Sequence, residues 1–397
     1  MKKRVYITAL HMQHGGIEMA ISLLSNALAK RGYIVTILSV YNLGEVAYRL
    51  EPNVEVQYLT NVAPNRTEFL QAKRERNVYK LLKEGIYSLK VLYLKNKNMR
   101  NAISSIEDGI IISTRNEHSV LLSKYGKKGV CKIAQLHHDH EFKEVYVRDF
   151  QKNYKRIDRF VLLTQGLKDE VEEMMRGHNV HTKCVVIPNF LEEVISDVEI
   201  DQKEKTVLFV GRLHPVKGLE RLLDIWKIIS GKYPDWKLKI IGGGELDKVL
   251  KVKVKQLDLS RSVDITGAME HDKVLSEMKK ASIYAMTSYS EAFPFVLIEA
   301  MSKGLPVVAF DVRVGPRAIV EHNKDGFLVE DDDLAQFAEH VSMLISDKNQ
   351  WVKLSTNALD KSKIFTEKNV IKKWIALFDD CIGEKGELPN GIQKKDS

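Results

Sequence analysis

Residues 207–218 read Val-Leu-Phe-Val-Gly-Arg-Leu-His-Pro-Val-Lys-Gly, and this stretch decides the fold of the second half of the chain. Its four apolar residues predict a buried strand, and residues 219–230 continue with apolar side chains at helical spacing. A strand, a short loop and a helix form the repeating unit of a parallel sheet. Because ligands bind at the carboxyl ends of such strands, we expect Arg212 and Lys217 to face a binding site. Two cations there would neutralise the charge of an anionic ligand, although taken alone the pair could also be ordinary surface cations.

The same alternation of strands and helices runs along the rest of the chain. Short apolar runs predict strands in the first half at 5–10, 35–40, 54–59, 110–113, 132–136, 159–163 and 185–188. The second half adds 207–210, 238–241, 263–266, 283–286, 306–310 and 326–329. This pattern favours an α/β protein with two Rossmann-like, doubly wound parallel-sheet domains that face a central cleft.

Composition shifts predict the domain boundaries. We expect a first domain over residues 1–190, an acidic and polar linker over 191–205, and a second domain over 206–365. A final helix over 366–383, capped by Thr366, would cross back to the first domain. The polar tail at 384–397 is expected to be disordered.

Composition also narrows the setting of the protein. The chain has 397 residues, is 44% hydrophobic, and contains no apolar stretch near the roughly 20 residues that span a membrane. Its first residues lack the pattern of a secretory signal. Cys131, Cys184 and Cys381 are odd in number and scattered, with no metal spacing or disulfide framework, so we expect a cytoplasmic protein.

The net charge of +8 is concentrated in residues 66–100, which carry ten lysines and arginines against three glutamates. Apolar residues interleave with these charges at helical spacing. The segment therefore predicts one or two basic amphipathic helices that could rest on an anionic membrane surface. A helix pair with a packed face and a solvated basic face is the equal alternative. No nucleic-acid motif accompanies the charge, so nucleic acid is not expected as a partner.

A second informative stretch is Glu291-Ala-Phe-Pro-Phe-Val-Leu-Ile-Glu299, which follows the apolar run at 283–286. Pro294 is expected at the first position of a helix, where its missing N–H costs nothing. The backbone amides of Phe295 and Val296 would then be free to face an anion. Free amides between two carboxylates suit a ligand with phosphates and hydroxyls, such as a sugar nucleotide. The alternative is an ordinary surface helix that contains glutamates.

Gly211-Arg212 and Lys217-Gly218, upstream of Glu291 and Glu299, resemble the signature of the retaining nucleotide-sugar glycosyltransferases of GT-B fold, family four. The resemblance covers nearly the whole chain. It implies that Arg212 and Lys217 bind the donor diphosphate, and that the amides of Phe295 and Val296 meet a phosphate. It further implies that Glu299 binds the ribose hydroxyls and Glu291 the hydroxyls of the transferred sugar.

Other residues match the donor site of this family with less specific patterns. Gly243, within Gly242-Gly243-Gly244, would allow close approach of the backbone to the nucleotide, and Met269 would border the base. Gly15 and Gly16 would approach the donor from the first domain, although a tight strand-to-helix turn also favours glycine. Asn189 matches a family position, but Phe190 follows where many members have glycine.

The segment Gln135-Leu-His-His-Asp-His140 supplies a candidate catalytic histidine. The resemblance aligns His137 with a family histidine that contacts the sugar, with His138 as the alternative. Three nearby histidines could suggest zinc, but they lack the helical spacing of a zincin site. Asp331-Asp-Asp333 resembles a metal-binding D-x-D pattern, but it directly precedes a helix, where carboxylates are common. We therefore predict no metal and no other cofactor, and we name His137, Glu291, Arg212 and Lys217 as catalytic.

The sequence thus predicts a retaining glycosyltransferase that moves a hexose or N-acetylhexosamine from a UDP-sugar to a hydroxyl. The expected acceptor is a lipid-linked glycan or a cell-envelope polysaccharide or teichoic-type polymer, reached from the inner face of the membrane. A nucleotide-sugar epimerase of similar shape and a non-catalytic scaffold of the same fold are the alternatives. Front-face displacement and a covalent intermediate both stay open.

Overall fold

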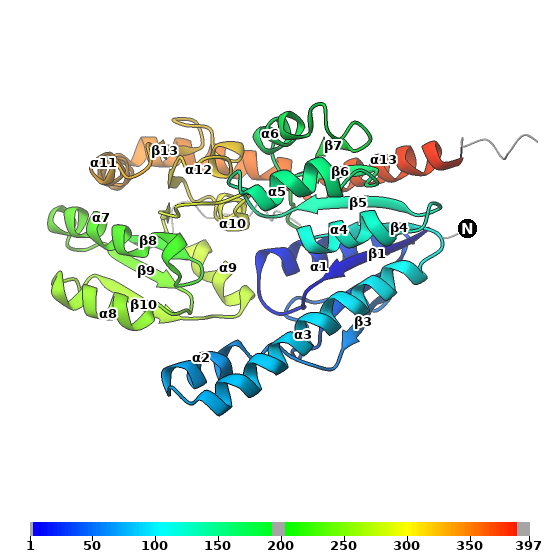
Figure 1. The fold of residues 1–397 in the computed structure, drawn as a ribbon. Helices are drawn as coiled ribbons and strands as arrows, with labels where there is room; N and C mark the ends of the chain where they lie inside the picture. Colours follow the sequence, from blue (N-terminus) through cyan, green and yellow to red (C-terminus); the bar gives the residue numbers. More distant parts are fainter. Residues whose placement is uncertain (1–2, 193–202, 387–397) are drawn as a thin grey trace, which may run out of the picture. The chain divides into compact units, whose positions relative to one another are not determined.

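A seven-stranded, fully parallel sheet organises the first half of the chain in the computed structural model, which describes residues 3–192 and 203–386 (Figure 1). The strand order is β3-β2-β1-β4-β5-β6-β7. The strands are β1 (Arg4–Ala9), β2 (Ile34–Tyr41), β3 (Val54–Thr60), β4 (Ile110–Ser113), β5 (Cys131–Leu136), β6 (Arg159–Leu162) and β7 (Lys183–Val186). The predicted doubly wound sheet of this half is confirmed.

Helices connect these strands. They are α1 (Gly16–Ala29), α2 (Arg66–Arg74), α3 (Val78–Ser105), α4 (Asn116–Tyr125), α5 (Glu144–Arg148) with the π-helical turn Asp149–Asn153, and α6 (Gln165–Met175). Strand order reverses between β1 and β4. Because crossovers between parallel strands are right-handed as a rule, such a reversal places helices on both faces of a sheet.

The second sheet is also fully parallel and has six strands in the order β10-β9-β8-β11-β12-β13. These are β8 (Thr206–Val210), β9 (Lys237–Ile241), β10 (Val263–Gly267), β11 (Ile283–Met286), β12 (Val307–Phe310) and β13 (Gly326–Val329). The helices are α7 (Leu219–Lys232), α8 (Asp247–Gln256), α9 (His271–Lys280), α10 (Phe295–Ser302), α11 (Leu334–Ser346), α12 (Lys348–Ser362) and α13 (Glu367–Gly386). Single 3-10 turns lie at Pro215–Lys217, Pro316–Ala318 and Lys363–Phe365.

The chain divides into two compact units. The first comprises the residues up to 162, residues 168–187 and the chain from 371 onward, and the second comprises residues 163–167 and 188–370. Most of the predicted linker at 191–205 and of the predicted tail at 384–397 lies outside the described residues. Residues 384–386 continue α13, so the final helix runs three residues beyond its predicted end.

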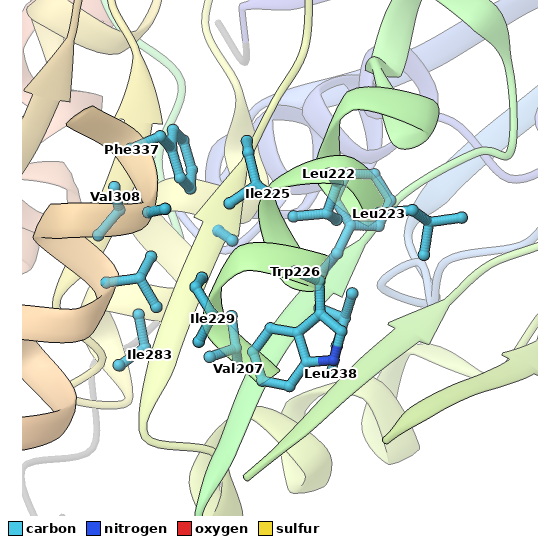
Figure 2. Close-up of a cluster of buried hydrophobic side chains, with 14 of the residues drawn as sticks. Val207, Leu222, Leu223, Ile225, Trp226, Ile229, Leu238, Ile283, Val308 and Phe337 are labelled. Carbon is cyan, nitrogen blue, oxygen red and sulfur yellow. The ribbon is translucent and has the colours of Figure 1, made fainter. Parts of the chain in front are cut away.

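The core of the second unit shows why residues 219–230 form a helix. Leu222, Trp226 and Ile229 recur at spacings of four and three, and each is at most 1% exposed. Figure 2 shows this face of α7 packed against Val207 and Leu238 of the sheet. The indole Nε1 of Trp226 donates to Ser262 Oγ at 3.1 Å, so its polar atom is satisfied as well. Burial of such a side chain stabilises the fold by about 2–3 kcal/mol.

The basic segment forms α2 and α3, which lie side by side (Figure 1). Asn77 caps α3, since its side chain accepts a hydrogen bond from Lys80 N at 3.0 Å. Only Val91, Met99 and Ile103 of α3 are fully buried. No helix among the described residues is long and apolar enough to cross a membrane.

The sequence showed no disulfide framework, but Cys131 and Cys381 form a disulfide with Cα atoms 6.1 Å apart. One lies at the start of β5 and the other on α13, 250 residues later in the chain. The buried Arg159 of β6 also binds α13, at Asp380. The disulfide therefore fastens the last helix to the first unit, and cysteine usage no longer argues for a reducing compartment.

Candidate active site

The order of strands in the second unit reverses between β8 and β11, and the two predicted motifs follow these neighbouring strands. Arg212 and Lys217 follow β8, whereas Glu291 and the start of α10 follow β11. Ligands of open α/β sheets bind outside the carboxyl ends of the strands at such a reversal. The topology therefore brings both motifs to the binding edge of this sheet.

Lys217 and Glu291 contact each other directly. Lys217 Nζ lies 2.5 Å from Glu291 Oε1, and Ser288 Oγ donates to the same oxygen at 2.7 Å. Both charged side chains are mostly buried, with 19% and 13% of their surface exposed. Lys217, predicted to bind the diphosphate, and Glu291, predicted to bind the sugar, therefore lie side by side.

The two loops that carry this pair are joined through their backbones. Tyr289 N donates to Val216 O at 2.8 Å, and Thr287 Oγ1 donates to Lys217 O at 3.2 Å. Gly218 adopts a left-handed conformation with φ of 62°, and a Cβ there would lie 1.9 Å from Thr287 O. Only glycine combines this backbone with so close an approach.

Arg221, which the sequence analysis missed, fixes the loop after β11. Its side chain is 4% exposed and donates to Thr287 O at 2.8 Å, Ser288 O at 2.7 Å and Asp331 Oδ1 at 2.8 Å. The guanidinium also lies 3.9 Å from the centroid of the Tyr289 ring. Arg221 therefore positions the segment that carries Ser288. An arginine in the first turn of an amphipathic helix gives no sequence signal of such a role.

The glycine loop after β9 lies against the loop after β8. Leu213 N donates to Gly243 O at 2.9 Å, and a Cβ on Gly242, with φ of 153°, would lie 1.8 Å from Gly211 O. Gly243 in turn approaches Ala268, the residue before Met269, in the loop after β10. Gly243 and Met269 thus lie at the same carboxyl edge as Lys217.

Arg212 is exposed, and within the described parts of the chain it has no ion-pair partner. His214 N-caps the turn that follows, because its Nδ1 accepts from Val216 N at 3.2 Å. The cap fixes the backbone of the loop and leaves the Arg212 guanidinium available for an anion.

The start of α10 differs from the prediction in one respect. Pro294 is the N-cap, with ψ of 106°, and the first helical residue is Phe295. A proline fixes only φ, and here its ψ is extended, so the helix begins one residue later than expected. The later start of the helix still leaves the amides of Phe295 and Val296 in its first turn. Nothing in the described residues accepts from the amides of Phe295 and Val296, which are first-turn donors.

Glu299 projects from the second turn of α10 into a buried environment, with 6% of its surface exposed. Its Oε1 has no hydrogen-bond donor among the described residues and lies 3.5 Å from His271 Nε2. Burial raises the pKa of the Glu299 carboxyl to about 7, against the attraction of Lys303, which lowers it. A buried carboxylate oxygen without a donor marks a place where a ligand can supply one.

The first unit presents its own residues at the reversal between β1 and β4. Gly15 ends the loop after β1 and its N donates to Tyr48 Oη at 3.3 Å, and Gly16 is the first residue of α1. Glu18, in the first turn of α1, is buried, and its Oε1 lies 3.6 Å from His11 Nδ1.

His137 follows β5, the neighbour of β4, and its Nε2 is buried without a hydrogen-bond partner among the described residues. Burial lowers the pKa of His137 to about 3, aided by the nearby His138 and Arg115. The imidazole is therefore neutral at pH 7. His138 is exposed, and His140 is buried with its Nε2 3.1 Å from Glu170 Oε2. Of the three histidines, His137 has the free buried nitrogen.

A second buried histidine, His118 of α4, escaped the sequence analysis. Its Nδ1 lies 3.0 Å from Thr8 Oγ1 at the end of β1, and its Nε2 has no partner within the described ranges. Burial lowers the pKa of His118 to about 3. A lone histidine within a helical pattern carries no signal, because only the sheet order brings α4 beside β1.

The remaining predicted positions have structural contacts. Asn189 is buried, at 6% exposure, in the segment that begins the second unit. Asp333 N-caps α11 by accepting from Gln336 N at 2.9 Å, as its position before a helix predicted. Asp331 binds Arg221.

The two Rossmann-like units have the GT-B fold, and the strand order of the second unit reverses between β8 and β11, where Arg212, Lys217 and the start of α10 lie. Residues 191–361 match the model of the family described as Glycosyl transferases group 1. This match lies within the second unit, and relatives that align with most of the chain are also described as glycosyltransferases, so the chain is similar to that family.

Among these relatives is an uncharacterized glycosyltransferase of Haemophilus influenzae, 28% identical, with 91% of this chain and 95% of the relative covered. An alpha-1,4-N-acetyl-D-galactosaminyltransferase of Campylobacter jejuni, named for a PP-undecaprenol-linked acceptor, is 27% identical and covers 95% and 98% of the two chains. A mutant of S. aureus TarM in complex with fondaparinux, alpha-GlcNAc-glycerol and UDP superposes with a TM-score of 0.75. It covers 95% of this chain and 100% of its own at 15% identity, a likeness that shows the fold.

Proposed function

We propose that this protein is a glycosyltransferase that moves a hexose or N-acetylhexosamine from a UDP-sugar to a hydroxyl group, with retention of the anomeric configuration. The observation that carries the donor proposal is the buried Glu299 Oε1, which lacks a donor among the described residues. The two neighbouring hydroxyls of a ribose can donate hydrogen bonds to this carboxylate. Their hydrogen bonds to a carboxylate would stabilise its charged form, and each such bond contributes about 1.5–3 kcal/mol.

The phosphates of the donor have separate partners in this proposal. The first-turn amides of Phe295 and Val296 offer unpaired donors at the positive end of α10. Lys217 and the exposed Arg212 supply two positive charges after β8. These groups offer positive charge and hydrogen-bond donors to a diphosphate, and we propose that the transfer uses no metal ion.

Glu291 is proposed to hold hydroxyls of the transferred sugar. Its Oε1 is engaged by Lys217 and Ser288, which orients the carboxylate and leaves Oε2 to accept from the ligand. In the proposed front-face step the bond between the anomeric carbon and the phosphate oxygen breaks while the acceptor oxygen bonds to the same face. The acceptor proton passes to the departing phosphate oxygen, and Lys217 stabilises the charge of that group.

Similarity supports the proposed acceptor, a lipid-linked glycan or an envelope polymer. The Campylobacter jejuni relative is named for a PP-undecaprenol-linked glycan, and the TarM structure contains alpha-GlcNAc-glycerol and UDP. We accordingly propose that the enzyme works at the cytoplasmic face of a membrane. An epimerase or a non-catalytic scaffold is not favoured, because the family match is to glycosyltransferases.

A panel of UDP-sugars tests the donor without any acceptor. We expect slow hydrolysis of one UDP-sugar, measured as released UDP, which Glu291→Ala abolishes while UDP binding persists. Glu339→Ala, at an exposed position of α11, is the matched control and should behave like the parent. Epimerised sugar without released UDP would contradict the proposal, and so would a Glu291→Ala variant with full activity.

A further inference from the structure

The first half of α3 exposes an apolar stripe. Five residues at spacings of three and four form it, and each is between 62% and 79% exposed: Tyr79, Leu82, Ile86, Leu89 and Tyr93. At 100° per residue they fall within one sector of the helix, and the buried Val91 lies on the opposite side. Soluble surfaces seldom carry such a contiguous patch, which marks an interaction site.

A groove continues this stripe toward α2. It has a volume of about 530 Å³ and is lined by Phe69 of α2 and by Leu81, Leu82, Gly85, Ile86 and Leu89 of α3. Gly85 opens the groove, because a Cβ there would lie 3.8 Å from the Phe69 ring. The apolar face is therefore wider than the stripe itself.

Three exposed lysines border the stripe on its other side. Lys83, Lys90 and Lys97 recur every seven residues, so they stand nearly above one another along the helix. Glu84 is the one acid in the sequence of α3, and its Oε2 accepts from Asn65 at the α2 side. The exposed face thus combines apolar and positively charged side chains without acids.

The stripe has the spacing of a coiled-coil seam, which raises a second copy of the chain as an occupant. In that register the three lysines take every e position, whereas Val78, Gly85 and Leu92 take the g positions. A parallel pair would place lysines beside apolar residues, and an antiparallel pair would place lysines beside lysines. Neither supplies an acid, so a second copy is a poor match for this face.

We propose that this face of α3 docks the first unit on a bilayer of anionic phospholipids. The stripe would enter the boundary between headgroups and acyl chains, and the lysine row would contact lipid phosphates. This inference rests on the proposed function only for the place of the acceptor, since a lipid-linked acceptor lies in that same bilayer.

Vesicle flotation tests the docking. The full chain is mixed with vesicles of phosphatidylcholine alone, or of phosphatidylcholine and phosphatidylglycerol in equal amounts. We expect it to float with the anionic vesicles and to stay behind with the neutral ones. Negligible flotation with both, or equal flotation with both, would overturn the proposal.

Variants of exposed residues show which side chains act. Lys83→Gln, Lys90→Gln and Lys97→Gln together should weaken binding to the anionic vesicles on the order of 100-fold, or about five-fold per lysine. The control replaces an equal number of exposed lysines of α13 by glutamine, at positions 368, 372 and 373, and should bind like the parent. Equal loss in both sets would show a general charge effect and overturn the assignment to α3.

A third variant addresses the apolar stripe and the rival occupant. Leu82→Ser, Ile86→Ser and Leu89→Ser together should lower vesicle binding by at least about tenfold, without loss of thermal stability, because all three side chains are exposed. A dimer of the parent in solution that these changes dissolve would overturn the proposal in favour of a second copy.

Donor hydrolysis separates this inference from the proposed function. Measured without vesicles, it should be the same in the parent and in the lysine variant. A parent that floats but hydrolyses no UDP-sugar would contradict the proposed function alone, whereas hydrolysis without flotation would contradict the docking alone.

Discussion

Glu299 is predicted to lower the stability of the folded protein at neutral and alkaline pH, and Glu299→Gln should restore it. Burial raises the pKa of this carboxyl from 4.5 to about 7, against the opposing attraction of Lys303. The unfolded chain releases the proton near the ordinary pKa, whereas the folded protein keeps it to about pH 7. Between these values the folded state binds more protons, so the free energy of unfolding falls as pH rises.

The shift sets the size of the effect. A rise of the pKa from 4.5 to about 7 corresponds to about 3 kcal/mol. The contribution of Glu299 is neutral below about pH 4.5 and reaches its full destabilisation above about pH 7. A glutamine has nearly the same shape and stays uncharged throughout, so it removes this dependence on pH.

Urea unfolding of the parent and of Glu299→Gln between about pH 5 and 9 measures the prediction. The variant should gain stability over the parent as pH rises, by up to about 3 kcal/mol on the alkaline side. The matched control is Glu339→Gln, at an exposed position of α11. A difference for Glu299→Gln that is independent of pH would refute the reasoning.

The same substitution should weaken UDP binding, because it replaces a charged acceptor by a neutral amide. Loss of one charge-assisted hydrogen bond corresponds to about 1.5–3 kcal/mol, or roughly 10- to 100-fold in affinity. Calorimetric titration of UDP measures this change. A variant that is more stable and binds UDP less well is the behaviour of a binding residue. One that is more stable and binds UDP like the parent would remove Glu299 from the site.

Three further predictions follow from contacts in the structure. Lys217→Ala should lower UDP affinity by roughly 10- to 100-fold in the same titration, because a charged donor to the diphosphate is lost; unchanged affinity would show that Lys217 serves only Glu291. Arg221→Lys keeps the charge but loses the planar set of donors, so it should lower the free energy of unfolding by about 2 kcal/mol and slow donor hydrolysis with little change in KM. Urea unfolding and steady-state kinetics check both effects, and an unchanged rate would contradict a positioning role. Cys131→Ser or Cys381→Ser should lower the free energy of unfolding by about 2–4 kcal/mol under oxidising conditions only. An equal loss with and without reductant would contradict a contribution from the disulfide.

The sequence allows most of the fold and the second-unit site to be predicted, for an identifiable reason. Strands in a parallel sheet are buried on both faces, so runs such as 207–210 and 283–286 are continuously apolar and easy to find. The helix beginning at Leu219 was predicted at its observed first residue. Motifs that directly follow such runs, among them Arg212 and Lys217, then fall at the carboxyl edge by geometry alone.

Features that depend on tertiary packing could not be predicted in this way. Cys131 and Cys381 pair because α13 returns to the first unit, which no local pattern reveals. Arg221 binds two backbone carbonyls of a loop that comes 66 residues later in the chain. His118 meets Thr8 because β4 lies beside β1. In each case the contact joins segments that are distant in the sequence, and the residue type alone does not indicate its partner.

The central claim is that the second unit recognises the diphosphate of a nucleotide sugar through Arg212, Lys217 and the first turn of α10. Titration of UDP and of UMP into the full chain, without added metal, tests it most directly. We expect one saturable site for UDP and at least about tenfold weaker binding of UMP, which lacks one of the two phosphates. Equal affinities, or no saturable binding of UDP, would contradict the claim.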